Sequence, residues 1–301
     1  MRLSIVTVSW NTRDLLDRCL TTVKQELDSL SDVESEVFLI DNDSHDGSAD
    51  MVAKNHPWVR LVRNQSNLGF AKANNQALRE TSSDYVLLLN PDTEVLPGAI
   101  KRLIEFLETN PNCGVVAPQL LNTDGSVQRS CRAFPTFIGM LYELLGLSRM
   151  FPAGSEQGKK FREYKMLDWN HDDKREVDQP EGACLMIRRK VLDEVGLLDE
   201  GYFMLFEEVD WCYRVKQHGW QIWFDPASQV IHHYGQSIKQ VKARMILSSH
   251  RGLYRFWRKH YRGDRWYMDG FAYVGLMLLA YARIAAYMLK TALKGGRQEA
   301  V

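Results

Sequence analysis

The sequence of 301 residues lacks the patterns that mark several large classes of protein. Its five cysteines are scattered and none is spaced as Cys-x-x-Cys, which argues against a zinc site and against a disulfide framework. We expect them to be small buried residues in a reducing compartment. The formal net charge is zero, so no overall positive field favours nucleic acid as a partner. The N-terminus also lacks the apolar core and cleavage site of a signal peptide.

The phosphate-binding motifs of two common enzyme classes are missing as well. No Gly-x-Gly-x-x-Gly follows the first apolar run, so a dinucleotide-dependent enzyme is disfavoured. Residues 154–160 superficially resemble a P-loop, but the glycine spacing is wrong, no Ser or Thr follows the lysines and no strand precedes them. We therefore do not expect a nucleoside triphosphate site there.

Strand-like and helix-like segments alternate through the first 120 residues. Short apolar, β-branched runs predict buried strands at residues 3–8, 37–40, 59–62, 85–89 and 114–117. Apolar residues at helical spacing predict helices at residues 13–27, 49–54, 71–80 and 98–109. This rhythm predicts an α/β fold, Rossmann-like, with a mostly parallel sheet and helices on both faces. Ligands bind such sheets at the carboxyl ends of the strands, where Asn11, residues 41–44 and residues 90–92 fall.

The second half of the chain is less regular. Residues 118–179 show no period and predict irregular structure or short helices beside the cleft. Order returns with a strand at residues 183–188, a helix at 207–218 and strands at 221–224 and 230–231.

Near the C-terminus, an apolar stretch at residues 271–289 follows a basic, aromatic run at residues 255–262. Its length is close to the roughly 20 residues that span a bilayer, but Arg283 interrupts it. Three interpretations remain open: a helix lying on a membrane surface, a spanning helix, and an ordinary packed helix.

Two segments could contact a nucleotide. The carboxylate of Asp41 could accept a hydrogen bond from a pyrimidine base or a ribose hydroxyl, whereas Asp46 suits helix capping. Gly69 permits a tight entry to a helix whose N-terminus can face phosphate, and Lys72 adds a cation. Ordinary turn and loop chemistry is the alternative for both segments.

Two further segments could carry out chemistry. Asp92 ends a strand and could hold Mg²⁺ or Mn²⁺, although a strand-terminating turn has the same composition. Glu207, Glu208 and Asp210 crowd a helix start, where the macrodipole favours acids for purely structural reasons. Aromatic neighbours would raise the pKa of a carboxylate there and make it a competent base.

Taken together and in this order, the segments resemble the glycosyltransferase family 2 enzymes with the GT-A fold. The resemblance runs over residues 3–237, and its wording is close to the bacterial rhamnosyltransferase-like branch. It is carried by residues 3–11 (LSIVTVSWN), the Asp41 segment, and residues 67–70 (NLGF), 89–93 (LNPDT) and 203–210 (FMLFEEVD).

The resemblance implies roles for single residues. Thr7, Val8, Asn11 and Asp41 would hold the nucleoside. The turn with Asn67, Gly69 and Lys72 would lie along the ribose and diphosphate, and Asn90 and Asp92 would also contact the nucleotide sugar. The segment 90–92 stands where the family often has Asp-x-Asp, so Asp92 would be the surviving metal ligand, with His232 supplying an imidazole. Glu208 would be the catalytic base.

Two departures from the family pattern bear on the site. Asn90 replaces an acid and removes one charge from the metal site, so metal dependence could be weaker than usual. Glu208 replaces the usual Asp, which should move the acceptor hydroxyl by about 1.5 Å, the length of one carbon–carbon bond. The Gln-x-x-Arg-Trp motif of processive synthases is absent, which favours addition of a single sugar.

We therefore expect an inverting enzyme that transfers one sugar, with rhamnose a candidate, in cell-surface polysaccharide synthesis. Its donor would be a dTDP- or UDP-linked sugar, its acceptor a saccharide or a polyprenyl-linked saccharide, and its cofactor Mg²⁺ or Mn²⁺. The GT-A domain would span residues 1–238, with a nucleotide-binding half at 1–118 and an acceptor-binding and catalytic half at 119–238. Residues 239–301 would form a basic, aromatic helical extension at the cytoplasmic, inner face of the cell membrane.

Two alternatives from other classes remain. A protein of the same fold could bind sugar nucleotides without catalysis. A sugar nucleotidyltransferase is the other, although the glycine-rich triphosphate loop after the first strand is missing.

Overall fold

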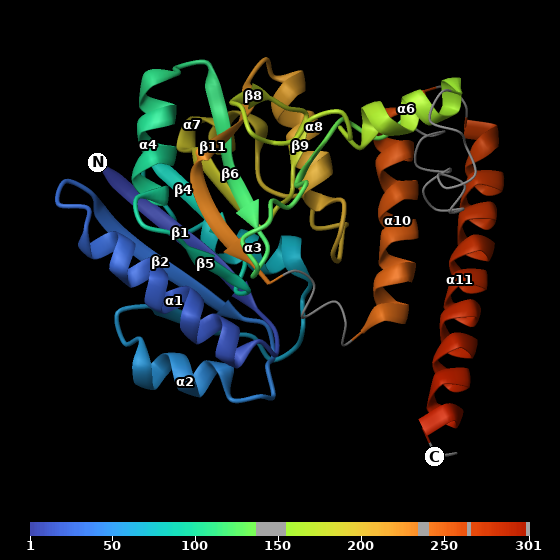
Figure 1. Cartoon of the computed structure of the whole chain (residues 1–301), viewed down its shortest axis with the longest axis horizontal. Helices are drawn as coiled ribbons and strands as arrows, with labels where there is room; N and C mark the ends of the chain where they lie inside the picture. Colours follow the sequence, from blue (N-terminus) through green and yellow to red (C-terminus); the bar gives the residue numbers. More distant parts are fainter. Residues whose placement is uncertain (137–154, 234–240, 264–265, 299–301) are drawn as a thin grey trace.

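The computed structural model describes residues 1–136, 155–233, 241–263 and 266–298, without the side chains of Gln157 and of residues 292–298. Within this part of the chain, nine strands form one sheet in the order β3-β2-β1-β4-β10-β6-β11-β5, with β8 paired to β11 (Figure 1). The strands are β1 (Arg2–Ser9), β2 (Glu34–Asp41), β3 (Arg60–Arg63), β4 (Tyr85–Leu89), β5 (Thr93–Val95), β6 (Cys113–Leu121), β8 (Arg175–Glu176), β10 (Cys184–Arg188) and β11 (Gln221–His232). A separate two-stranded sheet joins β7 (Cys131–Arg132) to β9 (Gln179–Pro180).

Helices cover both faces of the large sheet: α1 (Arg13–Asp28), α2 (Ser48–Asn55) and α4 (Ala99–Thr109) on one face, and α3 (Phe70–Leu78), α7 (Arg189–Val195) and α8 (Glu207–Gln217) on the other. Beside the sheet lie α6 (Glu156–Tyr164), α10 (Lys242–His260) and α11 (Asp269–Gln298), with a short 3₁₀ turn η2 (Trp266–Met268) before α11. Side chains alternate along β1: Leu3 and Ile5 pack under α1, α2 and α4, whereas Val6 and Val8 pack under α3, α7 and α8. The predicted fold class, with helices on both faces of the sheet, is confirmed.

The direction of the strands is mixed in the second half of the sheet. Strands β3, β2, β1 and β4 are parallel, as are β6 and β11. Strand β10 runs antiparallel to both of its neighbours, β4 and β6. The predicted strands at 221–224 and 230–231 are one strand, β11, whose register against β6 shifts between Asp225 and Gln229. Pro226 has no N–H to donate, so an irregularity at this point explains the gap in the apolar pattern.

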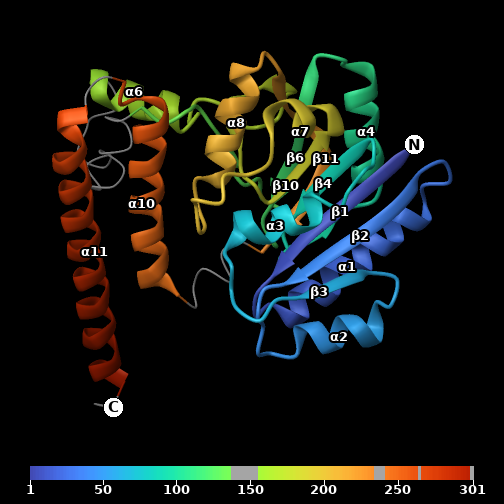
Figure 2. The ribbon, with the colours of Figure 1, turned by 180° about the vertical axis from the view of Figure 1, so that it is seen from behind.

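Helix α10 lies beside α8, and α11 lies on the far side of α10 (Figures 1 and 2). Phe256 of α10 is fully buried against Phe206 and Tyr213, and α11 packs along α10 through Leu276 and Met277. Residues 266–291 are long and apolar enough to cross a membrane by length and composition, and only 11% of the most apolar window is buried. The predicted helix at 271–289 is thus present, and most of its apolar surface is exposed.

All five cysteines are buried and free, in agreement with the expectation of small buried residues.

Candidate active site

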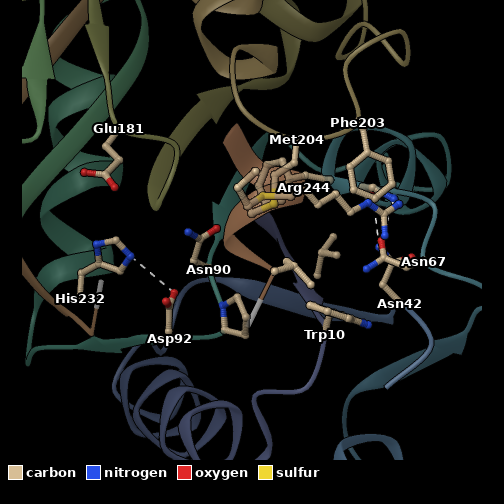
Figure 3. Close-up of a pocket in the computed structure, with 16 residues that line it drawn as sticks. Trp10, Asn42, Asn67, Asn90, Asp92, Glu181, Phe203, Met204, His232 and Arg244 are labelled. Carbon is tan, nitrogen blue, oxygen red and sulfur yellow. Dashed lines mark hydrogen bonds and ion pairs between the residues drawn. The ribbon is translucent and has the colours of Figure 1, made fainter. Parts of the chain in front are cut away.

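A cavity lies at the carboxyl ends of β1, β2 and β4, and we call it the strand-end cavity (Figure 3). Six of the predicted site residues line it: Val8, Asn67, Gly69, Asn90, Asp92 and His232. The lining also includes Trp10, Asn42, Glu181, Phe203, Met204 and Arg244. The polar ends of separate strands therefore meet in one place, as expected for a sheet of this type.

One wall of the strand-end cavity is a turn organised by the buried side chain of Asn42. Its amide nitrogen donates to Asn67 Oδ1 at 2.9 Å, and its Oδ1 accepts from the Leu68 backbone N–H at 3.0 Å. Gly69 has φ +83°, and a Cβ at this position would lie 2.3 Å from the Phe203 carbonyl oxygen. That carbonyl accepts a hydrogen bond of 2.7 Å from the Phe70 N–H at the start of α3. Only glycine fits at position 69, and the turn is thereby fixed to the Phe203 loop.

Buried polar atoms without partners lie around the strand ends. In the part of the chain that the structure describes, Thr7 Oγ1, Asp41 Oδ1 and Asn90 Oδ1 have no hydrogen-bond partner. A buried polar atom without a hydrogen bond destabilises the fold unless a ligand or a water molecule provides the partner. Their position under the strand-end cavity suits a polar ligand such as a nucleoside.

Asp92 and His232 face each other although 140 positions separate them. β5 follows Asp92 directly and pairs antiparallel with the end of β11, with His232 opposite Thr93. The His233 N–H donates to the Asp92 carbonyl at 2.8 Å, and His232 Nε2 lies 3.5 Å from Asp92 Oδ1 (Figure 3). Both side chains are buried. Burial alone would lower the pKa of His232, but the adjacent carboxylate of Asp92 and the charge of Glu181 raise it.

The side-chain amide of Gln128 fixes the tautomer of His232. Gln128 donates its amide N–H to the His232 carbonyl at 2.7 Å, so its Oε1 faces His232 Nδ1 at 3.1 Å and accepts from it. His232 Nε2 is then directed at Asp92, the arrangement found when a histidine binds a metal through one nitrogen. The described residues contain no group of three or more acids, histidines or cysteines that could bind a metal. Asp92 and His232 therefore suit a cation that takes its remaining ligands from a diphosphate and water.

Glu208 lines a neighbouring cavity, which we call the Glu208 cavity, together with Ser130, Arg132, Glu181 and Ser249. Glu208 stands in the first turn of α8, and its Oε2 is buried without a partner among the described residues. Burial raises the pKa of Glu208, and the charge of Glu181 raises it further, whereas Arg132 lowers it. A carboxylate with a raised pKa is suited to accept a proton near neutral pH.

The chain enters α8 through two strained residues. Leu205 and Phe206 have φ +72° and +78°, a region that costs non-glycine residues about 1–3 kcal/mol each. Strain of this kind persists where the surrounding structure enforces it, commonly at functional sites. Here the two strained residues directly precede the helix that carries Glu208 in its first turn.

Four of the predicted nucleotide contacts do not line the strand-end cavity as the described residues define it. Thr7 and Asp41 are buried just beneath it. Asn11 joins two loops instead, since its Oδ1 accepts from the His45 N–H at 2.8 Å. Lys72 is exposed on α3. Their roles as nucleotide contacts stay predictions. Asp46 accepts from the N–H groups of Arg13 and Ser48, as in a turn, but the N-cap residue of α2 is Gly47 and not, as expected from the sequence, Asp46.

Sequence reasoning missed three residues of the site. Asn42 directly follows Asp41 and could have been noticed as a polar residue at a strand end. Glu181 precedes a buried strand and was a weak signal of the same kind. Arg244 gave no local signal, because α10 must fold back over the Phe203 loop before its guanidinium reaches the cavity; it lies 4.2 Å from the centre of the Phe203 ring.

Comparison with known sequences identifies the family of the chain. The model of the glycosyl transferase family 2 matches residues 4–196. An N-acetylglucosaminyl-diphospho-decaprenol L-rhamnosyltransferase of Mycobacterium tuberculosis is 29% identical over 273 residues, which cover 87% of this chain and 85% of that protein. A low-salt glycan biosynthesis hexosyltransferase of Haloferax volcanii is 30% identical over 167 residues, covering 54% of this chain and 48% of that protein.

Solved structures share the fold. A mannosyltransferase of Pyrobaculum calidifontis, in complex with GDP-Man and Mn²⁺, aligns with a TM-score of 0.56 at 16% identity, covering 97% of this chain and 79% of that one. GalNAc-T7, with UDP, GalNAc and Mn²⁺, aligns with a TM-score of 0.54 at 19% identity, covering 76% of this chain and 42% of that one. The chain belongs to glycosyltransferase family 2, in its rhamnosyltransferase-like branch, and is an inverting glycosyltransferase with the GT-A fold.

Proposed function

We propose that the enzyme transfers a single L-rhamnose from a dTDP-linked donor to a saccharide carried on a polyprenyl diphosphate. The observation that carries this proposal is the adjacency of two cavities, one with the Asp92–His232 pair and the other with Glu208. A donor diphosphate fits the first and an acceptor hydroxyl the second. The rhamnosyl donor and lipid-linked acceptor are supported by the name of the mycobacterial relative.

Each residue has a defined task in this reaction. Glu208 removes the proton from the acceptor hydroxyl, whose oxygen bonds to the anomeric carbon from the face opposite the leaving group. The bond between that carbon and the diphosphate oxygen breaks, and the nucleoside diphosphate departs with the electron pair. Asp92 and His232 would hold Mg²⁺ or Mn²⁺, which when bound stabilises the charge of the departing diphosphate.

Arg244 supplies a further cation for the diphosphate in this proposal. It lines the strand-end cavity, and no acid pairs with it among the residues that the structure describes. Two carboxylates, Asp92 and Glu181, line the same cavity, so a donor with two negative charges needs compensation there. A guanidinium is well suited to phosphate oxygens because it presents several N–H donors in one plane.

The C-terminal helices carry the surface that would contact the membrane. We propose that residues 239–301 form a helical unit that holds the GT-A domain, residues 1–238, at the inner face of the membrane. The apolar side chains of α11 support this, since Phe271 is 85% exposed and Leu278 66% exposed. Within the GT-A domain, residues 1–118 would bind the nucleotide and residues 119–238 the acceptor.

Transfer assays on the full-length chain test the proposal. With dTDP-L-rhamnose, Mg²⁺ and a polyprenyl-diphosphate-linked N-acetylglucosamine, we expect an inverted product in the wild type. Glu208→Gln should lower kcat by about 10²- to 10⁴-fold, the range that general base catalysis contributes, with dTDP affinity unchanged. Glu176→Gln is the matched control, because Glu176 lies on β8 in an exposed pair with Lys216. Turnover by Glu208→Gln at the wild-type rate would rule out this base.

Donor specificity needs its own measurement. A thermal-shift panel of dTDP-, UDP- and GDP-linked sugars with and without Mn²⁺ should give the largest stabilisation with a dTDP-sugar, because a ligand that binds the native state stabilises it by mass action. If none of these nucleotides stabilises the chain, the donor class is wrong.

A further inference from the structure

Glu181 lies between the two cavities of the site. In the part of the chain that the structure describes, it is the one residue that lines both the strand-end cavity and the Glu208 cavity. Figure 3 shows its carboxylate extending toward the space above His232 and Asp92. A group that links a diphosphate at Asp92 to an acceptor at Glu208 would therefore lie beside this side chain.

The backbone around Glu181 is held firmly in place. The Glu181 N–H donates to the Ser130 carbonyl at 2.8 Å, and two residues later the Ala183 carbonyl accepts from the Asn90 N–H at 2.9 Å. The second contact ties this segment to the end of β4, two positions before Asp92. Glu181 therefore has a fixed position relative to the metal-binding pair.

The carboxylate of Glu181 is polar, half-buried and available. It has no hydrogen-bond partner among the described residues, although His232 and Arg132 act on it as positive charges. Burial and the charge of Asp92 raise its pKa, whereas His232 and Arg132 lower it. A partly desolvated carboxylate of this kind forms a strong hydrogen bond with a hydroxyl group, because hydrogen bonds to charged groups are stronger than those between neutral groups.

The group that must lie between the diphosphate and the acceptor hydroxyl is the sugar ring of the donor. We propose that Glu181 accepts hydrogen bonds from the hydroxyls of this sugar and is a specificity-determining residue of the donor site. This inference rests on the proposed function, because it takes the two cavities as donor and acceptor sites. A sugar that lacks the recognised hydroxyl binds poorly, since it leaves the Glu181 carboxylate desolvated and unpaired.

Calorimetric titration of the full-length chain with dTDP and with dTDP-L-rhamnose, in Mg²⁺, tests the assignment. The ratio of the two Kd values measures how much the sugar contributes to the affinity for the donor. We expect Glu181→Gln and Glu181→Ala to bind dTDP as the wild type does and to reduce the contribution of the sugar by about ten-fold or more, the loss of one hydrogen bond to a charged group. Glu176→Gln, exposed on β8, should change neither value.

Three results would overturn the assignment. The contribution of the sugar to the affinity could be unchanged in both Glu181 variants. The Kd values of dTDP and dTDP-L-rhamnose could also rise by the same factor, which would indicate that the substitution disrupts the whole cavity. Alternatively, kcat could be abolished with the sugar contribution intact, which would make Glu181 a proton acceptor. Binding of dTDP by the wild type reports on the proposed function separately: if neither dTDP nor UDP binds, the proposed function fails first, and Glu181 with it.

Discussion

Gly182 packs directly against the side chain of Glu208: a Cβ at position 182 would lie 3.3 Å from the Glu208 Cβ and 3.4 Å from its Cγ. Glu208 must therefore shift by a few tenths of an ångström to admit a larger residue. In the proposed reaction, we expect Gly182→Ala to lower kcat by about ten-fold or more, because small displacements of a catalytic group are costly, with little change in the Kd for dTDP. Steady-state kinetics and calorimetry measure the two quantities.

Gly125→Ala is a control with glycine in an exposed turn, where no atom lies within 4 Å of the added Cβ, although its φ of +81° strains any substitution. It should lower stability without lowering kcat at saturating substrate. Equal kcat for Gly182→Ala and the wild type would mean that Glu208 tolerates displacement and that its position does not limit the rate.

The pH dependence of kcat should reflect the raised pKa of Glu208. Burial raises this pKa, the charge of Glu181 raises it further, and the charge of Arg132 lowers it. As a base, Glu208 works only when deprotonated, so kcat should rise with pH through a limb above the usual glutamate range near pH 4.5. Arg132→Gln removes a charge that lowers this pKa, so the limb should move to higher pH. A limb that stays in place in Arg132→Gln would contradict the assignment of the limb to Glu208.

Glu207 should destabilise the fold at neutral pH. It is 4% exposed, and its Oε2 has no partner among the described residues. Burial, and then the charge of Glu208, raise its pKa well above the ordinary value. Because the folded-state pKa exceeds the unfolded one, the stability that Glu207 contributes is complete below the unfolded pKa and is lost as the pH rises through the folded pKa.

Glu207→Gln should therefore increase the free energy of unfolding at pH 7 by about 1–3 kcal/mol, the cost of a buried unpaired group. This gain should shrink toward pH 4, where the wild-type side chain is protonated. Urea unfolding at both pH values provides the measurement. A gain that is equal at the two pH values would show that packing, rather than ionisation, is responsible.

Asp210 links α10 to α8, the helix that carries Glu208. Its carboxylate is fully buried and lies 2.7 Å from His260 Nε2, 2.8 Å from Lys259 Nζ and 2.9 Å from Arg214 Nε. Asp210→Asn leaves the guanidinium of Arg214 without its counter-charge and removes one of the two carboxylates that pair with Lys259, the other being Asp199, so we expect the free energy of unfolding to fall by about 3–5 kcal/mol. Asp193→Asn is the control, because Asp193 makes an exposed pair with Arg189 four residues earlier and should cost under about 1 kcal/mol. Equal losses in the two variants would show that the buried cluster contributes no more than a surface pair.

The exposed apolar side chains of α11 should bind lipid. Serine at both Phe271 and Leu278 should weaken binding to vesicles of phosphatidylcholine and phosphatidylglycerol by at least about ten-fold, since each side chain contributes about 1.5–3 kcal/mol when buried. The control carries serine at Ala282 and Ala285, which are also exposed but small. Vesicle flotation compares them. If both double variants float as the wild type does, α11 does not bind the membrane through this face.

Local patterns predicted most of the helices and strands but only part of the site. The ends of β1, β2 and β4 could be predicted because short apolar runs stop abruptly at polar residues. The contact of Asp92 with His232 could not be derived from local pattern, since it depends on the antiparallel pairing of β5 with β11. The family resemblance supplied His232 as a candidate, and the strand pairing explains why it is near. Lys72 was the expected cation, but Arg244 reaches the cavity because a distant helix folds back over it.

The origin of Arg244 in α10 has a consequence for how the protein is made. A nascent chain emerges from the ribosome N-terminus first, and its early segments fold before the later ones exist. The first 120 residues contain the ends of β1, β2 and β4, yet the imidazole of His232 arrives with β11, and Arg244, Lys259 and His260 arrive with α10. The lining of the strand-end cavity is thus complete only when α10 has been synthesised, directly before α11. In the proposed function, the donor site and the helix expected to contact the membrane are therefore acquired almost together.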